Sequence, residues 1–435
     1  MKYFGTDGIR GKAYDFITEE MSFRVGKSLN KFINRTNKII IARDTRISGE
    51  MIVNNIKKGA LLAGLDVYDM GVYATPILAF ATIKSDCFGI MVTASHNPYH
   101  DNGIKVFNRG EKSLPLDEEL IEDVIDNDID LAGITPGKEI AIKNLIDDYF
   151  DLYEVFPINK KFNMGLDLAN GATVKSGLKV LQKYADKCLV IGNDPNGINI
   201  NDDCGSTHLQ KLQQLVKDNC LDLGIAFDGD GDRVLVIDDE SDIIDGDLLI
   251  YIFAKYLKSQ NLLNNNVVVL SKMSNLGIIK ALNNLGIRVI QTEVGDKYIF
   301  KALADEEATL GGENSGHIIN KVLLKSGDGV LNAWFLLKIL NHYDVLLSSL
   351  KKEVSYYPDS LVNIRNIDKS IVKDEDIISL VKHYQNLLGE DGKVLVRASG
   401  TEPLIRISVS ASKKSTVDEI TNELVNAIKN KGKVE

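Results

Sequence analysis

The chain has 435 residues, of which 44% are hydrophobic and 26% charged, as is ordinary for a soluble globular protein of about three domains. Its formal net charge of −10 argues against a general nucleic-acid binder, because such proteins carry a basic face. The four cysteines show no Cys-x-x-Cys spacing, and neither a signal peptide nor a long apolar segment is evident. We therefore expect a cytoplasmic protein with reduced thiols and no membrane span.

Short apolar runs alternate with amphipathic segments of helical length, which predicts α/β domains followed, from about residue 366, by an α+β unit. The predicted strands are Ile39–Ile41, Val67–Met70, Phe88–Val92, Asn163–Leu168, Leu223–Phe227, Val267–Leu270, Arg288–Gln291, Val394–Arg397 and Ile405–Val409. Helices are predicted from Gly49 to Gly64, from Asp117 to Ile129 and from Thr207 to Lys217, with a last helix opened by Thr416. Asp117 is the expected N-cap of its helix, and Thr207 and Thr416 are in capping-box register with Gln210 and Glu419.

The segment from Met91 to Phe107, MVTASHNPYHDNGIKVF, begins as a buried strand and turns into a polar loop at Asn97-Pro98. Ser95 lies at the apex of this loop and is followed directly by His96. Since loops at strand ends are often functional, we expect Ser95 to be exposed and to project into a cleft. The alternative is an ordinary hydroxyl in a polar turn, and the spacing does not fit a Gly-x-Ser-x-Gly nucleophile elbow.

A second loop, Asp228-Gly229-Asp230-Gly231-Asp232-Arg233, follows an apolar run and places carboxylates at alternate positions. Hard oxygen ligands of this kind suit Mg²⁺, whereas a solvated acidic turn is the alternative. An EF-hand is excluded because its twelfth position would be Asp239 instead of glutamate. Arg233 is placed to neutralise the acids or to reach a phosphate oxygen.

Two further loops carry polar groups beside glycines. A glycine-rich turn is expected at Gly311, followed by Glu313, Ser315 and His317, which offer hydrogen-bonding groups and a titratable ring. Near the C-terminus, arginines, hydroxyls and a glycine turn have the composition of a phosphate cradle, without the spacing of a nucleotide P-loop. The residues of this cradle are Arg397, Ser399, Gly400, Thr401 and Arg406.

Taken together, the loops resemble those of the α-D-phosphohexomutase superfamily over essentially the whole chain, and most closely those of its branch that acts on glucosamine phosphates. The segments that carry this resemblance are Tyr3–Gly11, Arg43–Arg46, the Ser95 loop with Asp101–Lys105, Asn199–Asn201, Cys204–His208, Met273–Gly277, the Glu313 loop and Ser399–Pro403. Lys297 stands where the family usually has arginine, so a bidentate fork is lost. Ser410 stands where relatives commonly have glutamate.

The resemblance implies three related α/β domains with mixed sheets between helices and a smaller C-terminal α+β domain, arranged around one cleft. The expected ranges are 1–157 for the phosphoserine-loop domain, 158–250 for the metal-binding domain, 251–365 for the sugar-binding domain and 366–435 for the phosphate-binding domain.

The resemblance also implies a phosphohexomutase in which Ser95 rests as phosphoserine and a glucosamine 1,6-bisphosphate is the intermediate. One Mg²⁺ per active site is expected on Ser95, Asp228, Asp230 and Asp232, and Lys105 and His317 are the expected proton carriers. Substrate contacts are expected from Arg10, His96, Arg233, Lys297, Glu313, Ser315 and His317, while the Arg397–Arg406 cradle holds the other phosphate. The expected partner is a small phosphosugar, with no nucleic acid or membrane, and a homodimer is one assembly the resemblance allows. The alternatives are a related mutase for glucose or mannose phosphates and a non-catalytic regulator that binds sugar phosphates.

Overall fold

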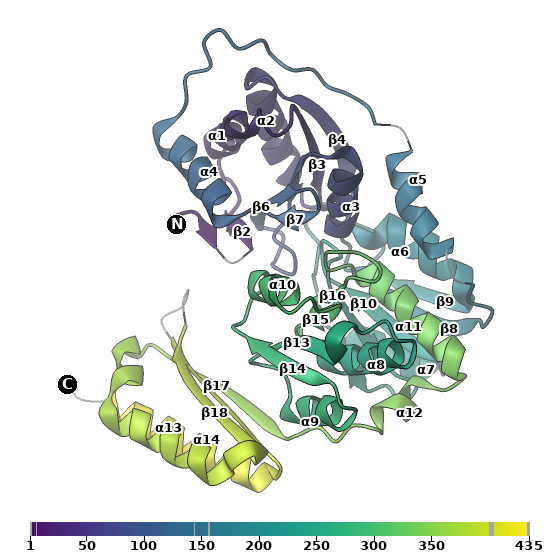
Figure 1. Ribbon diagram of the computed structural model, residues 1–435, viewed down its shortest axis with the longest axis vertical. Coiled ribbons are helices and arrows are strands. Elements are labelled where there is room, and N and C mark those ends of the chain that lie inside the picture. Colours follow the sequence, from purple (N-terminus) through teal and green to yellow (C-terminus); the bar gives the residue numbers. More distant parts are fainter. Residues whose placement is uncertain (1, 6, 143, 155–156, 400–403, 433–435) are drawn as a thin grey trace. The chain divides into compact units, whose positions relative to one another are not determined.

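The computed structural model describes residues 2–5, 7–142, 144–154, 157–399 and 404–432 (Figure 1). The chain forms two compact units, one of Met1–Met273 with Ile287–Lys351 and the other of Ser274–Gly286 with Lys352–Glu435. The first unit contains three mixed sheets with helices, and the second contains one antiparallel sheet. The predicted combination of α/β domains with a smaller α+β domain is therefore confirmed.

The first sheet has the strand order β1-β2-β6-β5-β3-β4, with β7 paired to β6. Apolar side chains of its central strands pack against α1, α2 and α4 in one buried core. Helices α1 and α2 pack so closely that a Cβ at Gly59 would lie 2.1 Å from the carbonyl oxygen of Phe23. Glycine at residue 59 allows this approach. The elements are β1 (Phe4–Gly5), β2 (Gly8–Lys12), α1 (Glu19–Ser28), β3 (Lys38–Arg43), α2 (Gly49–Leu62), β4 (Asp66–Val72), α3 (Thr75–Ser85), β5 (Phe88–Val92), β6 (Asp101–Asn108), β7 (Glu111–Lys112) and α4 (Pro115–Asn127).

The second and third sheets have the orders β12-β11-β10-β8-β9 and β14-β13-β15-β16. The elements around the second sheet are α5 (Leu145–Phe150), β8 (Phe162–Asp167), α6 (Thr173–Leu181), β9 (Ala185–Ile191), α7 (Gln210–Asn219), β10 (Leu223–Phe227), β11 (Val234–Ile237) and β12 (Ile243–Ile244). Those around the third sheet are α8 (Gly246–Ser259), β13 (Val267–Ser271), β14 (Arg288–Thr292), α10 (Asp296–Asp305), β15 (Leu310–Gly312), β16 (Ile318–Asn320), α11 (Gly329–Tyr343) and α12 (Leu347–Lys351).

Two fully buried strands lead into the two central loops of the first unit, the Ser95 loop and the Asp228 loop. The residues of β5 and β10 are buried at every position, and both strands have the bounds predicted from their apolar runs. The Ser95 loop follows β5, and the Asp228 loop follows β10. Strand β15 differs from the expectation, because Gly311 and Gly312 pair within the sheet and the turn begins only at Glu313.

The predicted helix starts at Asp117, Thr207 and Thr416 are wrong. Helix α4 begins at Pro115, whose fixed φ suits the first helical position, and Leu114 is its N-cap. Helix α7 begins at Gln210 after Leu209, and the last helix begins at Lys414, in both cases without a side-chain cap. Asp117 lies instead inside the first turn of α4, where its carboxylate pairs with Arg35 at 2.7 Å.

The second unit consists of a sheet in the order β17-β19-β18 with helices, and its buried side chains form a separate core. Strand β17 pairs with β19 along its whole length, so this sheet begins before the boundary expected at residue 366. Its elements are α9 (Leu276–Asn284), β17 (Asp359–Arg365), α13 (Glu375–Leu388), β18 (Gly392–Ala398), β19 (Leu404–Ala411) and α14 (Lys414–Lys431). Across the described residues of both units, no helix is long and apolar enough to cross a membrane.

A buried polar network joins the segment before the second sheet to α11. Tyr149 of α5 donates a hydrogen bond to Asp328 Oδ2 at 2.7 Å, and its hydroxyl lies 2.7 Å from that of Tyr153. Asp328 caps α11 by accepting from the backbone N–H of Leu331 at 3.0 Å. Burial raises the pKa of Asp328 from its usual 3.8 to about 6, although the hydrogen bonds oppose this shift.

This raised pKa predicts a pH-dependent contribution to stability. Asp328 binds its proton more tightly in the folded state, so its protonation favours folding below about pH 4, and the contribution is lost as the pH rises from about 4 to about 6. At about 1.4 kcal/mol per pH unit, the total is about 3 kcal/mol. Asp328→Asn does not titrate, so its thermal midpoint should change less than that of the wild type between pH 4.5 and 7. Equal changes in both proteins would contradict the assignment.

Candidate active site

Ser95 lies in a tight turn directly after β5. Its backbone is in the left-handed region, with a φ of 52°, and the residue is only 1% exposed, so the expected exposure is wrong. The hydroxyl donates to Asp228 Oδ2 at 2.5 Å and lies 3.3 Å from His96 Nδ1. Burial, followed by the charges of Arg233 and Arg10, lowers the pKa of His96 to about 4, so its ring is neutral at pH 7.

Side chains from distant segments hold the Ser95 loop through its backbone. Arg46, which is fully buried, donates to the carbonyl oxygens of Ser95 and Asn97 at 2.9 Å and is paired with Asp44. Asn201 donates to the same two carbonyl oxygens. No role was predicted for Arg46 or Asn201 from the sequence, although both lie in segments that carry the family resemblance. These donors position the loop through its backbone carbonyl oxygens.

The three aspartates of the second loop converge, as the sequence predicts. Asp228, Asp230 and Asp232 are buried, and one oxygen of each lies within 4.8 Å of the others. Asp230 Oδ2 accepts hydrogen bonds from Thr75 Oγ1 at 2.6 Å and Lys105 Nζ at 2.8 Å. Among the described residues, Asp230 Oδ1 and Asp232 Oδ1 are buried and accept no hydrogen bond. Buried acceptors without donors suit a cation, so the donor set fits a hard divalent metal.

Four cations surround this acidic centre. Lys105 Nζ lies 2.8 Å from Asp230, 3.3 Å from Asp232 and 3.1 Å from Asp7. Burial alone would lower the pKa of Lys105, but these carboxylates raise it well above its usual value, so the amine is protonated. Asp7 also pairs with two further cations, Arg10 and Lys112. The Arg233 guanidinium lies 3.9 Å from Asp232 and 4.0 Å from Asp228.

The pKa values of two of the aspartates are shifted in opposite directions. Burial raises the pKa of Asp228 well above its usual value, and the neighbouring carboxylates of Asp230 and Asp232 add to the effect. For Asp230, the charge of Lys105 overcomes burial and lowers the pKa. The charge of Lys105 therefore favours the ionised form of Asp230, whereas burial and the neighbouring carboxylates favour the protonated form of Asp228.

The third loop joins the same centre. His317 and Arg233 form an antiparallel bridge, so the backbone of the Glu313 loop is adjacent to the aspartate loop. Glu313 Oε1 accepts a hydrogen bond from the Gly295 backbone N–H at 2.9 Å. Among the described residues, His317 Nδ1 and Ser315 Oγ are buried and have no hydrogen-bond partner. These unsatisfied groups are suited to binding the hydroxyl or amine groups of a ligand.

Lys112 belongs to β7 and Lys297 to α10, two elements that an ion pair joins. Lys297 is the second residue of α10, and its Nζ lies 5.4 Å from the centroid of the Tyr298 ring. Asp296, the first residue of α10, pairs with Lys112 of β7. Lys112 was not identified from the sequence, because its carboxylate partners lie far away along the chain.

The residues of the predicted phosphate cradle lie in the second unit. Arg397 in β18 is directly opposite Arg406 in β19, which places the two arginine side chains on the same face of the sheet. Ser399 donates its N–H to the carbonyl oxygen of Leu404, and its own carbonyl oxygen accepts from Lys369 Nζ at 3.0 Å. Lys369 is therefore a further cation here that was not predicted from the sequence. Gly400 and Thr401 lie outside the described residues. Ser410 lies between Asp359 and Lys393 of the neighbouring strands.

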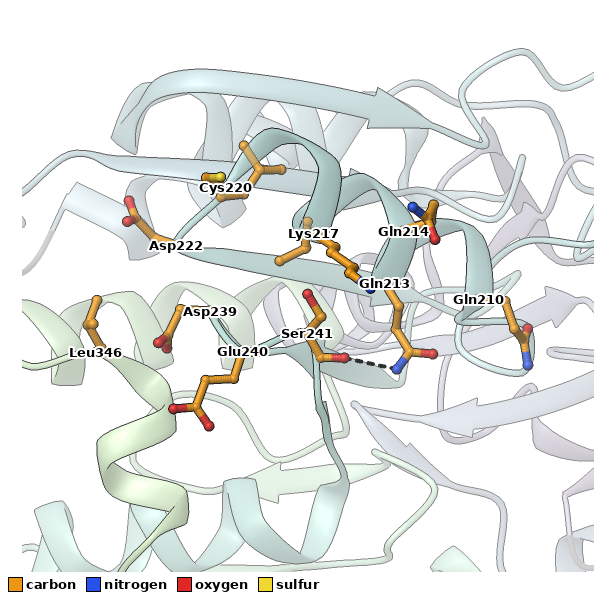
Figure 2. Close-up of a pocket in the computed structure, with 12 residues that line it drawn as sticks. Gln210, Gln213, Gln214, Lys217, Cys220, Asp222, Asp239, Glu240, Ser241 and Leu346 are labelled. Atoms are coloured by element: carbon orange, nitrogen blue, oxygen red, sulfur yellow. Dashed lines mark hydrogen bonds between the residues drawn. The ribbon is translucent and has the colours of Figure 1, made fainter.

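A polar groove of about 700 Å³ lies elsewhere on the first unit, and none of the predicted site residues line it (Figure 2). Its lining includes Asp222, which precedes β10, whereas Asp228 follows that strand. A strand of this length separates its two ends by roughly 17 Å. The carboxylates of Asp222 and Asp239 accept hydrogen bonds from the Asn163 and Ser348 backbones, so they are used within the fold.

Four family models match consecutive parts of the chain. They describe the phosphoglucomutase/phosphomannomutase α/β/α domains I, II and III and the C-terminal domain, at residues 1–131, 147–241, 245–357 and 361–427 respectively. Among solved structures, a phosphoglucomutase/phosphomannomutase family protein from Burkholderia thailandensis is similar with a TM-score of 0.81 and 21% identity, covering 98% of this chain and 97% of the other. This likeness establishes the fold.

The curated relatives are more similar in sequence. Phosphoglucosamine mutase from Shouchella clausii is 39% identical over 443 residues, which covers 98% of each chain. The proteins of the same name from Bacillus subtilis and Listeria monocytogenes are 38% and 40% identical, with 98% and 96% of each chain covered. On the strength of these matches, the chain belongs to the phosphoglucosamine mutase family of the α-D-phosphohexomutase superfamily.

Proposed function

We propose that this protein interconverts glucosamine 6-phosphate and glucosamine 1-phosphate, with Ser95 as the phosphoryl carrier, in the supply of amino-sugar precursors for the cell wall. The observation that carries the proposal is the direct hydrogen bond between the Ser95 hydroxyl and Asp228, within a buried carboxylate triad. The names of the curated relatives support the choice of sugar. A cytoplasmic location and a homodimer stay predictions.

The reaction is a pair of phosphoryl transfers. The bond between phosphorus and Ser95 Oγ breaks, a bond from phosphorus to a sugar hydroxyl oxygen forms, and the hydroxyl proton passes to a proton carrier, for which His317 is proposed below. The resulting glucosamine 1,6-bisphosphate turns over and returns its other phosphoryl group to Ser95. Positioning and charge neutralisation dominate such transfers. In this proposal the chain supplies them by placing the buried Ser95 Oγ against cationic and metal-binding groups.

Mg²⁺ is the proposed cofactor, held by Asp228, Asp230, Asp232 and an oxygen of phosphorylated Ser95. When bound, it would neutralise negative charge on the phosphoryl group being transferred. The unsatisfied Oδ1 atoms of Asp230 and Asp232 support this assignment. Among the solved structures with this fold, an N-acetylphosphoglucosamine mutase from Aspergillus fumigatus is described in complex with GlcNAc-6P and magnesium.

The remaining site residues have proposed roles that follow from their charge and surroundings. Lys105, protonated and next to the triad, is suited to donating a proton or stabilising phosphate charge, and His317 is the second proposed proton carrier. Glu313 is proposed to bind the sugar amine through its carboxylate. The other substrate contacts are proposed for Arg10, His96, Arg233, Lys297 and Ser315, and those to the non-reacting phosphate for Arg397, Ser399, Gly400, Thr401 and Arg406.

A coupled turnover assay tests the proposal. With Mg²⁺ and a trace of bisphosphate, glucosamine 6-phosphate should exceed glucose 6-phosphate and mannose 6-phosphate in kcat/KM by at least about tenfold, because Glu313 is an ionic partner that only the amine can use. A preference for either neutral sugar would support a related mutase instead. Binding of all three sugars without turnover would support a regulator.

A further inference from the structure

Lys112 forms an ion-pair bridge between two segments that are distant along the chain. Its Nζ pairs with Asp7, in the turn before β2, and with Asp296, at the start of α10. The side chains of Lys112, Asp7 and Asp296 are 27%, 19% and 12% exposed, so solvent screens these pairs less than ordinary surface pairs. Burial would lower the pKa of Lys112, but Asp296 and Asp7 raise it, so the bridge is charged at neutral pH.

One end of the bridge reaches the phosphoryl-transfer site. The carboxylate of Asp7 lies 3.1 Å from Lys105 Nζ, which in turn donates to Asp230 Oδ2 at 2.8 Å. Asp7 also pairs with Arg10. The charge of Lys112 therefore acts on the same carboxylate that positions Lys105 beside the aspartate triad.

The other end reaches the sugar-recognition loop. Asp296 follows Gly295, whose φ of 130° is a conformation that residues other than glycine rarely adopt. The Gly295 N–H donates to Glu313 Oε1 at 2.9 Å, so the turn that begins α10 orients the Glu313 carboxylate. Figure 1 shows α10 close to β7, the strand that carries Lys112, in agreement with the ion pair. Fixing Asp296 therefore fixes the donor that Glu313 uses.

We propose that Lys112 is a positioning residue for sugar specificity. It holds the N-terminus of α10 so that Gly295 keeps Glu313 oriented toward the amine of the substrate, while Asp7 connects the same bridge to Lys105. The inference rests on the proposed function, because it concerns how the site discriminates between sugar phosphates. Lys112 acts through Asp296 and Gly295 and needs no contact with the substrate.

The test compares Lys112→Met, which keeps the length of the side chain and removes its charge, with Lys112→Arg, which keeps the charge. For Lys112→Met, kcat/KM should fall about tenfold with glucosamine 6-phosphate and about twofold with glucose 6-phosphate, so the preference for the amino sugar narrows about fivefold. Lys112→Arg should restore most of the preference. Asp296→Asn should narrow it as well, and it replaces Lys112→Met if that variant does not fold.

Lys57→Met is the matched control, because Lys57 also bridges two carboxylates, Asp69 and Glu139, away from the aspartate triad. It should leave the preference unchanged. An unchanged preference in both Lys112→Met and Asp296→Asn would overturn the proposal.

Amide hydrogen exchange separates the bridge from the proposed function. Peptides covering α10 should exchange faster in Lys112→Met than in the wild type or in Lys57→Met, whether or not the sugar assignment is right. If the wild type does not turn over glucosamine 6-phosphate but α10 exchanges faster in the variant, the proposed function fails and the bridge stands. Unchanged exchange in α10 would overturn the bridge itself.

Discussion

Ser95→Ala should reduce turnover by at least about a thousandfold, which corresponds to about 4 kcal/mol of lost transition-state stabilisation. The variant has no oxygen at this position, so it cannot accept or return a phosphoryl group. Alanine and serine are similarly strained at a φ of 52°, and the loop is held through backbone carbonyl oxygens by Arg46 and Asn201. The loss should therefore appear in kcat, with the fold intact.

The measurement is steady-state turnover of glucosamine 6-phosphate, together with peptide mass spectrometry of the segment that contains Ser95. The wild type should carry phosphate on Ser95, and the variant should carry none there. Ser22→Ala, which removes a buried hydroxyl in α1 that donates to the Thr18 carbonyl oxygen, is the matched control and should keep wild-type turnover. Wild-type turnover by Ser95→Ala would remove Ser95 from the reaction.

Asp230→Asn should raise the Mg²⁺ concentration needed for half-maximal activity at least about tenfold and lower the maximal rate about a hundredfold. The substitution removes one charge from the triad and weakens the ion pair to Lys105, because a neutral amide replaces the carboxylate that Lys105 contacts at 2.8 Å. Both effects reduce the charge balance that phosphoryl transfer requires. Titration of Mg²⁺ by calorimetry gives a readout that is independent of turnover.

Asp238→Asn is the control for this variant. Asp238 is also a buried carboxylate and directly follows β11 of the second sheet. Its Oδ1 accepts from the Glu240 and Asp242 backbone N–H groups, and the side-chain oxygen of asparagine can accept the same hydrogen bonds. It should leave the Mg²⁺ dependence unchanged. Full activity of the wild type in excess chelator would show that the triad works without a divalent cation.

Local patterns were sufficient to predict the strands that carry the central loops. Continuous apolar runs followed by polar loops predicted β5 and β10 with the bounds that the structure has. The alternating carboxylates after β10 also converge, as predicted. Helix starts were less predictable. At α4, the proline at residue 115 determined the start, although Asp117 is also a residue type that favours the N-cap position.

Contacts between distant segments could not be predicted from local patterns. Thr75 and Asp230 are separated by 155 residues, yet a 2.6 Å hydrogen bond joins Thr75 of α3 to Asp230 in the loop after β10. The roles of Arg46 and Lys112 also depend on partners brought together only by the tertiary fold. The same reason explains the error at Ser95, because the hydroxyl is enclosed by Asp228 from another sheet.

The enclosure of Ser95 limits what can phosphorylate it in the folded protein. A protein kinase has to draw its acceptor serine into its own cleft in an extended form, whereas Ser95 is 1% exposed and has a left-handed backbone. Extending this segment would break the hydrogen bonds from Arg46 and Asn201 to the Ser95 carbonyl oxygen. A small phosphorylated metabolite, unlike a kinase, does not need this segment to be extended. The first phosphoryl group of each new chain should accordingly come from a diffusible donor.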